Sequence, residues 1–440
     1  MKYRLSPGGA LSGTVRVPGD KSISHRSIML GALAKGTSRV SGFLEGEDAL
    51  ATVAAFRAMG VKIEGPRAGE VTVHGVGLHG LRAPRAPLDM GNAGTGMRLM
   101  SGLLAGQAFD SVLTGDASLS SRPMGRVMRP LRDMGAVIDA AEGDRPPLRI
   151  TGGQALRGID YALPMASAQV KSCVLLAGLY AAGRTSVAEP APTRDHTERM
   201  LEGFGYPVRV EGNTASLAGG GELRARDIEV PADISSAAFF LVGASIAPGS
   251  DLLLTHVGVN PTRTGVIEIL KLMGADIELQ NRREVGGEPV ADIRVRHARL
   301  RGIDVPEDLV PLAIDEFPVL FIAAACAEGT TRLTGAEELR VKESDRIASM
   351  AEGLDTLGVA SEVLPDGIVI EGGGMGGGMG GGEIRTFGDH RIAMAFSIAA
   401  LRAVEAITVL DCDHVATSFP GFDRIAAAAG LGIAAGEGDA

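Results

Sequence analysis

Hydrophobic and polar residues follow one layout that repeats six times along the chain. Each block opens with a short polar or charged cluster, continues with an apolar helix of small residues, and then has a strand-like run. In the first block, residues 27–36 predict a helix that ends at a glycine, and residues 37–43 predict a strand. A second helix is predicted over residues 44–60, and two short β-branched runs after it predict a pair of strands.

The six openings recur roughly every 65 to 80 residues, which is too long for a solenoid repeat. They read PGDKSISHR at 18–26, GNAGTGMR at 91–98, ASAQVKS at 166–172, PADISSA at 231–237, AIDEFPV at 313–319 and FGDHRIA at 387–393. The same helix end and strand start recur in three blocks, in the segments RAMGVKIEG, RDMGAVIDA and KLMGADIEL. We therefore predict one βαβαββ unit that is used six times.

The blocks divide into two groups of three. Three blocks lie between Asp20 and Val230, and three follow Pro231. Residues 1–17 are strand-like and precede the first block, so we expect them to complete the second domain. The predicted domains are therefore residues 18–231, and residues 1–17 together with 232–440.

Composition and charge limit the cellular compartments and binding partners that the protein could have. A chain of 440 residues that is 45% hydrophobic is long enough for two domains with large cores. Its net charge of −10 and its few aromatic residues argue against a nucleic-acid partner. The three cysteines, Cys173, Cys326 and Cys412, have neither metal nor disulfide spacing, which predicts buried free thiols. There is no apolar signal region and no membrane-length apolar run, so we expect a cytoplasmic protein without membrane contact.

Several openings carry groups suited to binding anions. Lys21, Ser22 and Arg26 are predicted at the start of a helix, where free N–H groups and the helix dipole favour negative charge. Solvated surface charges with a capping serine are the alternative interpretation. The glycine-rich opening around Gly94 allows close approach to the backbone, although such stretches are often only turns. Arg122 is predicted in a loop, where an arginine is usually solvated.

The third opening offers hydroxyl, amide and guanidinium donors. Ser167 and Gln169 are predicted at a helix start, beside Lys171, and Arg194 is predicted to begin the second helix of that block. This set suits a phosphate or a hydroxylated ring. Helix capping explains Ser167 about equally well.

The last two openings combine carboxylates with cations. Asp315 lies in an apolar stretch and is either a general base or an N-cap. Lys342 and Arg346 are predicted four residues apart on one helix with Glu343 between them, either as a proton carrier or as part of ordinary helix salt bridges. Arg391 is predicted in a first helical turn, where the dipole disfavours a cation. Because these features occupy equivalent points of the repeats, we expect them to converge on a polyanionic ligand.

In chain order, DKSISHR, GNAGTGMR, RPM, SAQVKS, TRDHTE, IDE, RVKESDR, GDHR and ATSFP resemble the 5-enolpyruvylshikimate-3-phosphate synthase family. The resemblance runs from about Leu5 to Leu431, and it is nearest to the bacterial class II branch. It implies an α/β fold of two domains, an inside-out α/β barrel of the enolpyruvyl transferase type. Each domain would have three βαβαββ repeats with inward helices, and the active site would lie in the cleft between the domains.

The resemblance also implies a reaction. The enolpyruvyl group of phosphoenolpyruvate moves to the 5-hydroxyl of shikimate 3-phosphate through a tetrahedral ketal, and phosphate is released. This reaction belongs to the biosynthesis of chorismate and the aromatic amino acids. It requires no metal or organic cofactor, and the enzyme is expected to be a monomer.

Individual residues receive roles from the same resemblance. Those that would bind shikimate 3-phosphate are Lys21, Ser22, Arg26, Ser167, Gln169, Arg194, Asp315 and Lys342. Those that would bind phosphoenolpyruvate are Lys21, Gly94, Arg122, Gln169, Arg346 and Arg391. Asp315 would accept the hydroxyl proton, Glu343 would deliver a proton to the methylene carbon, and Lys342 would lie beside the reacting hydroxyl.

The sequence departs from the common family pattern at three positions. Ala168, Glu338 and Thr417 stand where many members have Ser, Asn and Lys, which leaves open how much binding these positions carry. Gly94 has no methyl group to crowd glyphosate, so we expect ordinary competition of that inhibitor with phosphoenolpyruvate.

Three other functions compete with this interpretation. The related UDP-N-acetylglucosamine enolpyruvyl transferases normally use a Cys in the loop that here reads GDASLSSRPMGR. An RNA 3′-phosphate cyclase-like protein would need a basic face for RNA. A non-catalytic anion-binding scaffold would have no use for both Asp315 and Glu343.

Overall fold

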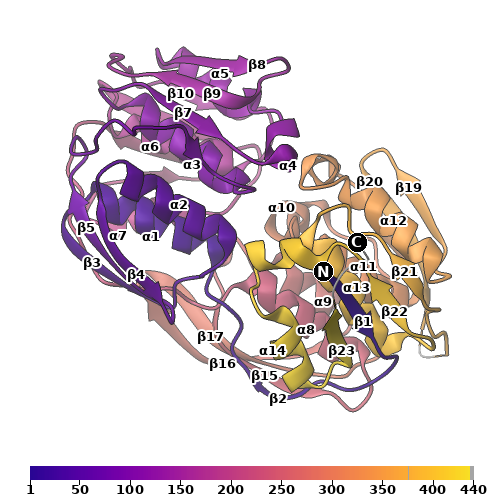
Figure 1. The fold of residues 1–440 in the computed structure, drawn as a ribbon. Coiled ribbons are helices and arrows are strands. Elements are labelled where there is room, and N and C mark those ends of the chain that lie inside the picture. The colour runs from indigo at the N-terminus through magenta and orange to yellow at the C-terminus, as the bar shows by residue number, and fades with distance from the viewer. Residues whose placement is uncertain (375, 437–440) are drawn as a thin grey trace. The chain divides into compact units, whose positions relative to one another are not determined.

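The protein is described by a computed structural model that covers residues 1–374 and 376–436, and it has two compact units (Figure 1). The first unit comprises Gly19–Val230 together with Val285–Glu288. The second unit comprises Met1–Pro18, Pro231–Glu284 and Pro289–Ala440. The chain therefore passes between the units at residues 18–19 and 230–231, and again at the turn around residues 285–288.

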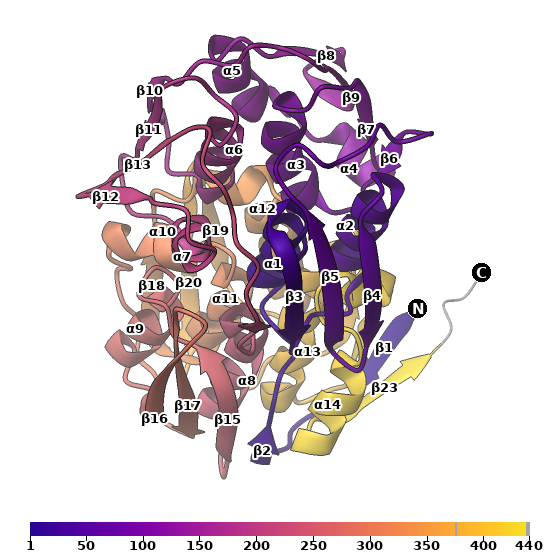
Figure 2. The same ribbon diagram turned by 90° about the vertical axis from the view of Figure 1, so that its left-hand side faces the viewer.

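The first unit contains three repeats, each with one four-stranded sheet (Figure 2). The first repeat has α1 (Lys21–Leu33), β3 (Lys35–Ser41), α2 (Glu47–Ala58), β4 (Lys62–Arg67), β5 (Glu70–Val76) and β14 (Ile228–Glu229). The second has β6 (Leu88–Asp89), α3 (Gly94–Ala105), β7 (Ser111–Thr114), α4 (Ala117–Ser121), α5 (Gly125–Asp133), β8 (Val137–Ala141) and β9 (Arg145–Thr151). The third has β10 (Asp160–Ala162), α6 (Ala168–Gly178), β11 (Arg184–Ala188), α7 (His196–Gly203), β12 (Arg209–Glu211) and β13 (Thr214–Ala218).

The second unit repeats the same plan. Its fourth repeat has β2 (Ser12–Val15), α8 (Ile234–Ile246), β15 (Asp251–Gly258), α9 (Gly265–Leu272), β16 (Asp276–Val285) and β17 (Glu288–Arg296). The fifth has η1 (Glu307–Leu309), α10 (Val310–Ala313), α11 (Phe317–Cys326), β18 (Glu328–Leu333), η2 (Glu337–Val341), α12 (Arg346–Thr356), β19 (Ser361–Leu364) and β20 (Gly367–Gly373). The sixth has β21 (Gly382–Ile384), α13 (His390–Ala399), η3 (Ala400–Arg402), β22 (Ile407–Val409), η4 (Cys412–Thr417), α14 (Phe422–Ala429), β23 (Ile433–Gly436) and β1 (Lys2–Leu5).

Read from the parallel edge, strand order is the same in five of the six sheets, and the fifth sheet has three strands that follow the antiparallel part of this order. In the first unit the orders are β14-β3-β5-β4, β6-β7-β9-β8 and β10-β11-β13-β12, with the first pair parallel and the others antiparallel. The second unit follows with β16-β17-β15-β2, β18-β20-β19 and β21-β22-β1-β23. In Figure 1 the indigo strand β1 lies between the yellow strands β22 and β23. The first residues of the chain thus complete two sheets of the second unit.

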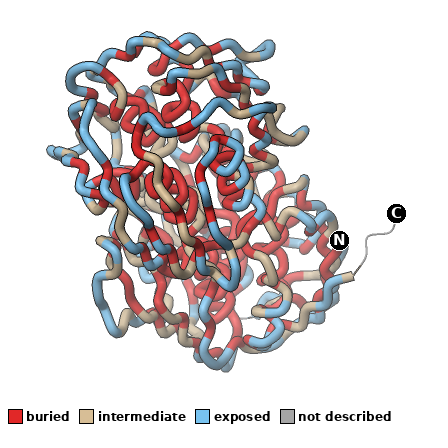
Figure 3. The backbone as a smooth tube through the Cα atoms, turned by 60° about the vertical axis from the view of Figure 1, so that its left-hand side comes forward, coloured by how far each residue is buried: buried red, intermediate tan, exposed pale blue. Residues whose placement is uncertain are grey.

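The first helix of each repeat is buried. All residues of α8, α11 and α13 are buried, and most of those in α1, α3 and α6 are (Figure 3). A helix that is apolar on every side is stable only inside a core. Small residues let these helices approach each other closely: a Cβ at Gly102 would lie 2.1 Å from the carbonyl oxygen of Cys173. The sheets therefore cover an inner set of three helices in each unit, and each inner helix begins at one of the polar openings.

Candidate functional site

The first opening begins α1 in the way that the sequence predicts. The Asp20 carboxylate caps the helix by accepting a bond from the Ile23 N–H at 2.8 Å. Lys21 lies in the first turn and donates to Asp48 Oδ2 at 2.9 Å. Ser22 follows and is partly exposed. The start of α1 thus presents an ammonium group and a hydroxyl group side by side in sequence.

Arg26 lies one turn further along α1 and is buried. Its guanidinium donates to Thr197 Oγ1 at 2.7 Å, to Ser172 Oγ at 2.8 Å and to the Ser22 carbonyl oxygen at 3.0 Å. Burial lowers the pKa of Arg26 to about 10, although the carboxylate of Glu198 opposes this effect. The unliganded protein therefore holds this charge at a cost in free energy.

Arg194 adds a second positive charge beside Arg26. Its field also lowers the pKa of Arg26, which shows that the two guanidinium groups repel each other. The prediction that Arg194 begins a helix is wrong: α7 begins at His196 and Asp195 is its N-cap. Two cations held close together in the first unit favour a negatively charged ligand.

The second opening surrounds the start of α3 with guanidinium groups. Arg122 ends the short helix α4 and donates to Asn92 Oδ1 at 2.6 Å and to Ser118 Oγ at 2.9 Å. A Cβ at Gly94 would lie 3.1 Å from Arg98 Nη1 and 3.2 Å from Arg122 Nη1. The missing side chain therefore leaves room beside two cations.

Arg98 belongs to the site but was not among the predicted residues. It donates to Gln169 Oε1 at 2.9 Å, and Gln169 Nε2 donates to Thr95 Oγ1 at 2.9 Å. These bonds tie the second opening to the third. Arg98 is the last residue of the motif GNAGTGMR, so its spacing of one helical turn from Gly94 was the available signal.

Ser167 is the N-cap of α6, which is one of the two roles that the sequence left open. Its hydroxyl accepts from the Val170 N–H at 3.4 Å, and the residue is partly exposed. A cavity of about 170 Å³ opens beside it, lined also by Arg126, Arg129 and Tyr161. The arginines give this side of the Ser167 hydroxyl a cationic rim.

In the second unit, Asp315 lies between α10 and α11. The prediction of apolar surroundings is wrong, because its carboxylate is 3.1 Å from Arg346 Nη1, 3.4 Å from Lys342 Nζ and 3.9 Å from Arg391 Nη2. The N-cap alternative is also wrong, since Glu316 precedes α11 and Pro318 occupies its first turn. Three cations thus surround a partly exposed carboxylate.

Lys342 and Glu343 lie in the connection between η2 and α12. The prediction of one helix that carries Lys342 and Arg346 is wrong: Asp345 caps α12 by accepting from the Ala348 N–H at 3.0 Å, so the helix begins at Arg346. Lys342 Nζ donates to Glu338 Oε1 at 2.7 Å, and Glu343 pairs with Arg346 at 2.6 Å. Glu343 therefore forms an ion pair with Arg346, one of the cations expected beside it.

Arg346 is the centre of the second-unit cluster. It donates to Asp389 Oδ2 at 2.8 Å, in addition to its bonds to Glu343 and Asp315, and its side chain is 1% exposed. Burial opposes the charge of Arg346, but the three carboxylates hold its pKa above the ordinary value. Asp389 caps α13 by accepting from the Arg391 N–H at 2.9 Å, which places Arg391 in the first turn as predicted.

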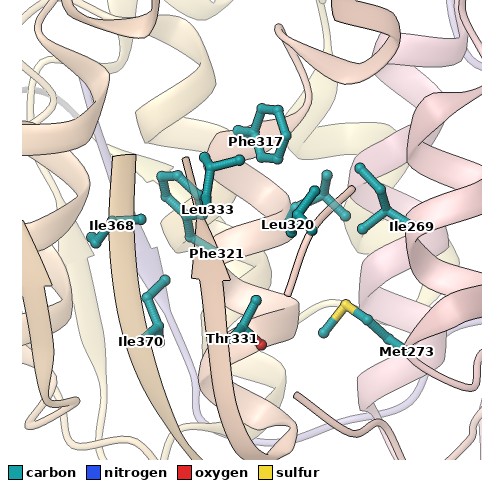
Figure 4. Close-up of a pocket in the computed structure, with 10 residues that line it drawn as sticks. Ile269, Met273, Phe317, Leu320, Phe321, Thr331, Leu333, Ile368 and Ile370 are labelled. Carbon is teal, nitrogen blue, oxygen red and sulfur yellow. The ribbon is translucent and has the colours of Figure 1, made fainter. Parts of the chain in front are cut away.

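Other features of the described chain do not suggest a second centre. A pocket between α9, α11 and the β18–β20 sheet is lined by apolar side chains and by Thr331, and it holds about 10 Å³, room for roughly one water molecule (Figure 4). In residues 1–374 and 376–436, no group of three His, Cys, Asp or Glu could hold a metal ion. No helix in those residues has the length and hydropathy needed to span a membrane. The three cysteines are buried and free, as predicted, and burial raises the pKa of each thiol to about 12.

Comparison with known proteins gives the same family throughout. A model of the EPSP synthase family (3-phosphoshikimate 1-carboxyvinyltransferase) matches residues 5–425. The 3-phosphoshikimate 1-carboxyvinyltransferase of Alkalilimnicola ehrlichii is 69% identical over 439 residues, covering 100% of this chain and 98% of that protein. That of Methylococcus capsulatus is 67% identical over 431 residues, covering 98% of both.

Solved structures agree with the sequence relatives. An EPSP synthase from Acinetobacter baumannii aligns with a TM-score of 0.88 and 62% identity, covering 98% of this chain and 99% of that one. The enolpyruvyl transferase NikO from Streptomyces tendae aligns with a TM-score of 0.78 at 18% identity, covering 98% of each chain. The second likeness concerns the fold alone, and it confirms the predicted enolpyruvyl transferase architecture.

Proposed function

The chain belongs to the EPSP synthase family, and from this premise we propose how its two clusters divide the work of one reaction. The enzyme transfers the enolpyruvyl group of phosphoenolpyruvate to the 5-hydroxyl of shikimate 3-phosphate and releases phosphate. The observation that carries the assignment of roles is the gathering of cations in each unit. Lys342, Arg346 and Arg391 lie within 3.9 Å of Asp315 in the second unit, and in the first unit Arg26 lies in the field of Arg194, which lowers the pKa of Arg26.

Shikimate 3-phosphate binds mainly to the first unit. Ser22 and Arg26 hold its carboxylate, and Ser167 and Arg194 hold its 3-phosphate. An anion beside Arg26 offsets the free-energy cost of burying the guanidinium, because it favours the charged form. Gln169 lies against the ring, in the place where Arg98 and Thr95 already fix its amide.

Phosphoenolpyruvate binds to cations from both units. Lys21, Arg122, Arg346 and Arg391 hold its phosphate and carboxylate, and the missing side chain at Gly94 leaves space for it. We place the active site in the cleft that the resemblance implies between the domains, where these groups would hold one ligand. Enclosing the two anions there orients them and excludes water from the reaction.

The chemistry begins with addition. Asp315 accepts the proton of the 5-hydroxyl as its oxygen attacks C2 of phosphoenolpyruvate, and Lys342 lies beside that oxygen. Glu343 gives a proton to C3, so that the methylene becomes a methyl group and the tetrahedral ketal forms. Glu343 is paired with Arg346, and an anion that takes over this arginine frees Glu343 to carry a proton.

Elimination completes the transfer. Glu343 takes a proton back from the methyl group, the C2–C3 double bond forms again, and phosphate leaves with the electron pair of its C2–O bond. The proton held by Asp315 goes to the departing phosphate. The surrounding cations stabilise the negative charge that develops on phosphate as it leaves.

Release of phosphate from purified protein tests the reaction. One sample contains phosphoenolpyruvate with shikimate 3-phosphate, and the other contains phosphoenolpyruvate with UDP-N-acetylglucosamine. We expect release in the first sample only. Release only with the nucleotide sugar would assign the related transferase activity, and no release in either sample would favour an anion-binding scaffold.

We also propose that the enzyme works as a cytoplasmic monomer without a nucleic-acid partner. The net charge of −10 supports the last point. Light scattering of the purified protein and fractionation of the source cells test the other two.

A further inference from the structure

Lys171 lies behind the third opening and belongs to no substrate-binding role proposed above. It is four residues after Ser167 on α6, and its side chain is 4% exposed. Its Nζ lies 3.0 Å from Glu189 Oε1 and 2.7 Å from Glu198 Oε1. It is also 3.5 Å from the carbonyl oxygen of Thr193. A buried ammonium has three N–H donors, and here each has an acceptor.

Both oxygens of the Glu189 carboxylate contact Lys171, and both also accept from Thr193, which closes the loop that leads to Arg194. Glu189 accepts from the Thr193 N–H at 3.2 Å and from the Thr193 hydroxyl. Its own N–H donates to the Asn213 carbonyl oxygen at 2.9 Å, which fixes it to the β12–β13 turn. One ammonium and one carboxylate therefore hold the residue immediately before Arg194.

Glu198 connects the same ammonium to Arg26. Burial raises the pKa of Glu198, and Lys171 opposes that rise. The charge of Glu198 in turn supports the charge of Arg26. Thr197, the residue next to Glu198, accepts from Arg26 and donates to Ser172 Oγ at 2.7 Å. Loss of Lys171 would leave two buried carboxylates beside each other without their cation.

We propose that Lys171 is a positioning residue for shikimate 3-phosphate: through Glu189 it sets Arg194, and through Glu198 it sets Arg26. This inference rests on the proposed function, in which these two arginines bind that substrate. Lys171 itself does not touch substrate, because all three of its donors point into the protein. An arginine could not replace it, since a planar fork does not match three acceptors around one atom.

The test distinguishes loss of the Thr193–Glu189 hydrogen bond from a general loss of stability. Thr193→Val keeps shape and removes only the hydroxyl that Glu189 holds. Thr185→Val is the matched control, because Thr185 Oγ1 is buried on β11 with no hydrogen-bond partner among the described residues. Lys171→Met removes the ammonium. Calorimetric titration with shikimate 3-phosphate gives Kd, steady-state kinetics give KM for each substrate, and thermal unfolding reports folding.

We expect Thr193→Val to raise Kd and KM for shikimate 3-phosphate about tenfold, with KM for phosphoenolpyruvate within about twofold and with Thr185→Val unchanged. Lys171→Met should have a larger effect in the same direction. If Lys171→Met does not fold, comparison of Thr193→Val with Thr185→Val still tests the inference. Equal Kd values for the two threonine variants would overturn the inference alone. Failure of the unchanged protein to bind shikimate 3-phosphate would overturn the proposed function and this inference with it.

Discussion

Addition of one methyl group at Gly94 tests the phosphoenolpyruvate half of the site. Gly94 is the first residue of α3, and its φ lies outside the left-handed region, so Gly94→Ala is compatible with the backbone. Alanine in a helix is favoured over glycine by about 0.5–1 kcal/mol, so the fold should not weaken. Any loss of phosphoenolpyruvate binding must then come from displacement of the two guanidinium groups that the new Cβ meets.

The geometry sets the size of that loss. The Cβ would lie 3.1 Å from Arg98 Nη1 and 3.2 Å from Arg122 Nη1, which is tight enough to displace each by a few tenths of an ångström. Arg122 cannot move freely, because Asn92 and Ser118 hold its Nη2 at 2.6 Å and 2.9 Å. Loss of one charge-assisted hydrogen bond to the ligand costs about 1.5–3 kcal/mol. We therefore expect KM for phosphoenolpyruvate to rise about 10- to 100-fold, and the inhibition constant of glyphosate to rise more.

The assay is phosphate release at varied phosphoenolpyruvate, with and without glyphosate. Gly96→Ala is the control, because it lies in the same helix and its Cβ would meet the flexible end of Met90 and the Thr52 hydroxyl. Its glyphosate inhibition should match that of the unchanged protein. Equal glyphosate inhibition of Gly94→Ala and the unchanged protein would refute the reasoning, as would a normal KM for phosphoenolpyruvate in Gly94→Ala.

Other groups give further predictions. Asp315→Asn should lower kcat about 10²- to 10⁴-fold while shikimate 3-phosphate still binds, and an unchanged kcat would remove Asp315 as the base. Glu343→Gln should abolish exchange of solvent deuterium into C3 of phosphoenolpyruvate, measured by NMR; exchange at the normal rate would contradict its role. Burial lowers the pKa of His25 to about 3, so the unfolded state binds its proton first and stability falls as pH drops from 6.5 toward 3. Between pH 6.5 and 4 this loss of stability is about 3 kcal/mol. His25→Gln should remove it, as measured by denaturant titrations at each pH. If the variant and the unchanged protein lose the same stability in acid, His25 is not its source. Arg346→Met should lower the free energy of unfolding by about 3–5 kcal/mol, because Asp389 would stay buried without its cation; an unchanged denaturation midpoint would be inconsistent with that burial.

The sequence predicted the repeated architecture because its signals are local. Gly60 follows the end of α2 as predicted, whereas α1 ends at Leu33 and Gly36 already lies in β3; α1 and α13 begin at the expected polar clusters. The errors in the candidate site also have local causes. Asp345 caps α12 by accepting from the Ala348 N–H, so the helix expected through Lys342 begins later.

What the sequence could not show is contact between distant residues. Arg346 and Asp389 are separated by 43 positions and meet only because the starts of α12 and α13 lie side by side. The surroundings of Asp315 were misjudged for the same reason, since the apolar residues are its neighbours in the chain and the cations are its neighbours in space. Arg98 carried a visible signal, but its bond to Gln169 depends on the approach of α3 to α6.

The placement of β1 between β22 and β23 affects the order in which parts of the nascent chain can fold. The residues of β1 leave the ribosome long before the residues with which they pair, 407–409 and 433–436. At 5 to 20 residues per second, this strand waits about 20 to 90 seconds for its partners. Residues 19–230 can fold during that time, but the second unit cannot. An early pause, or a bulky tag fused ahead of Lys2, should therefore affect completion of the second unit before it affects the first.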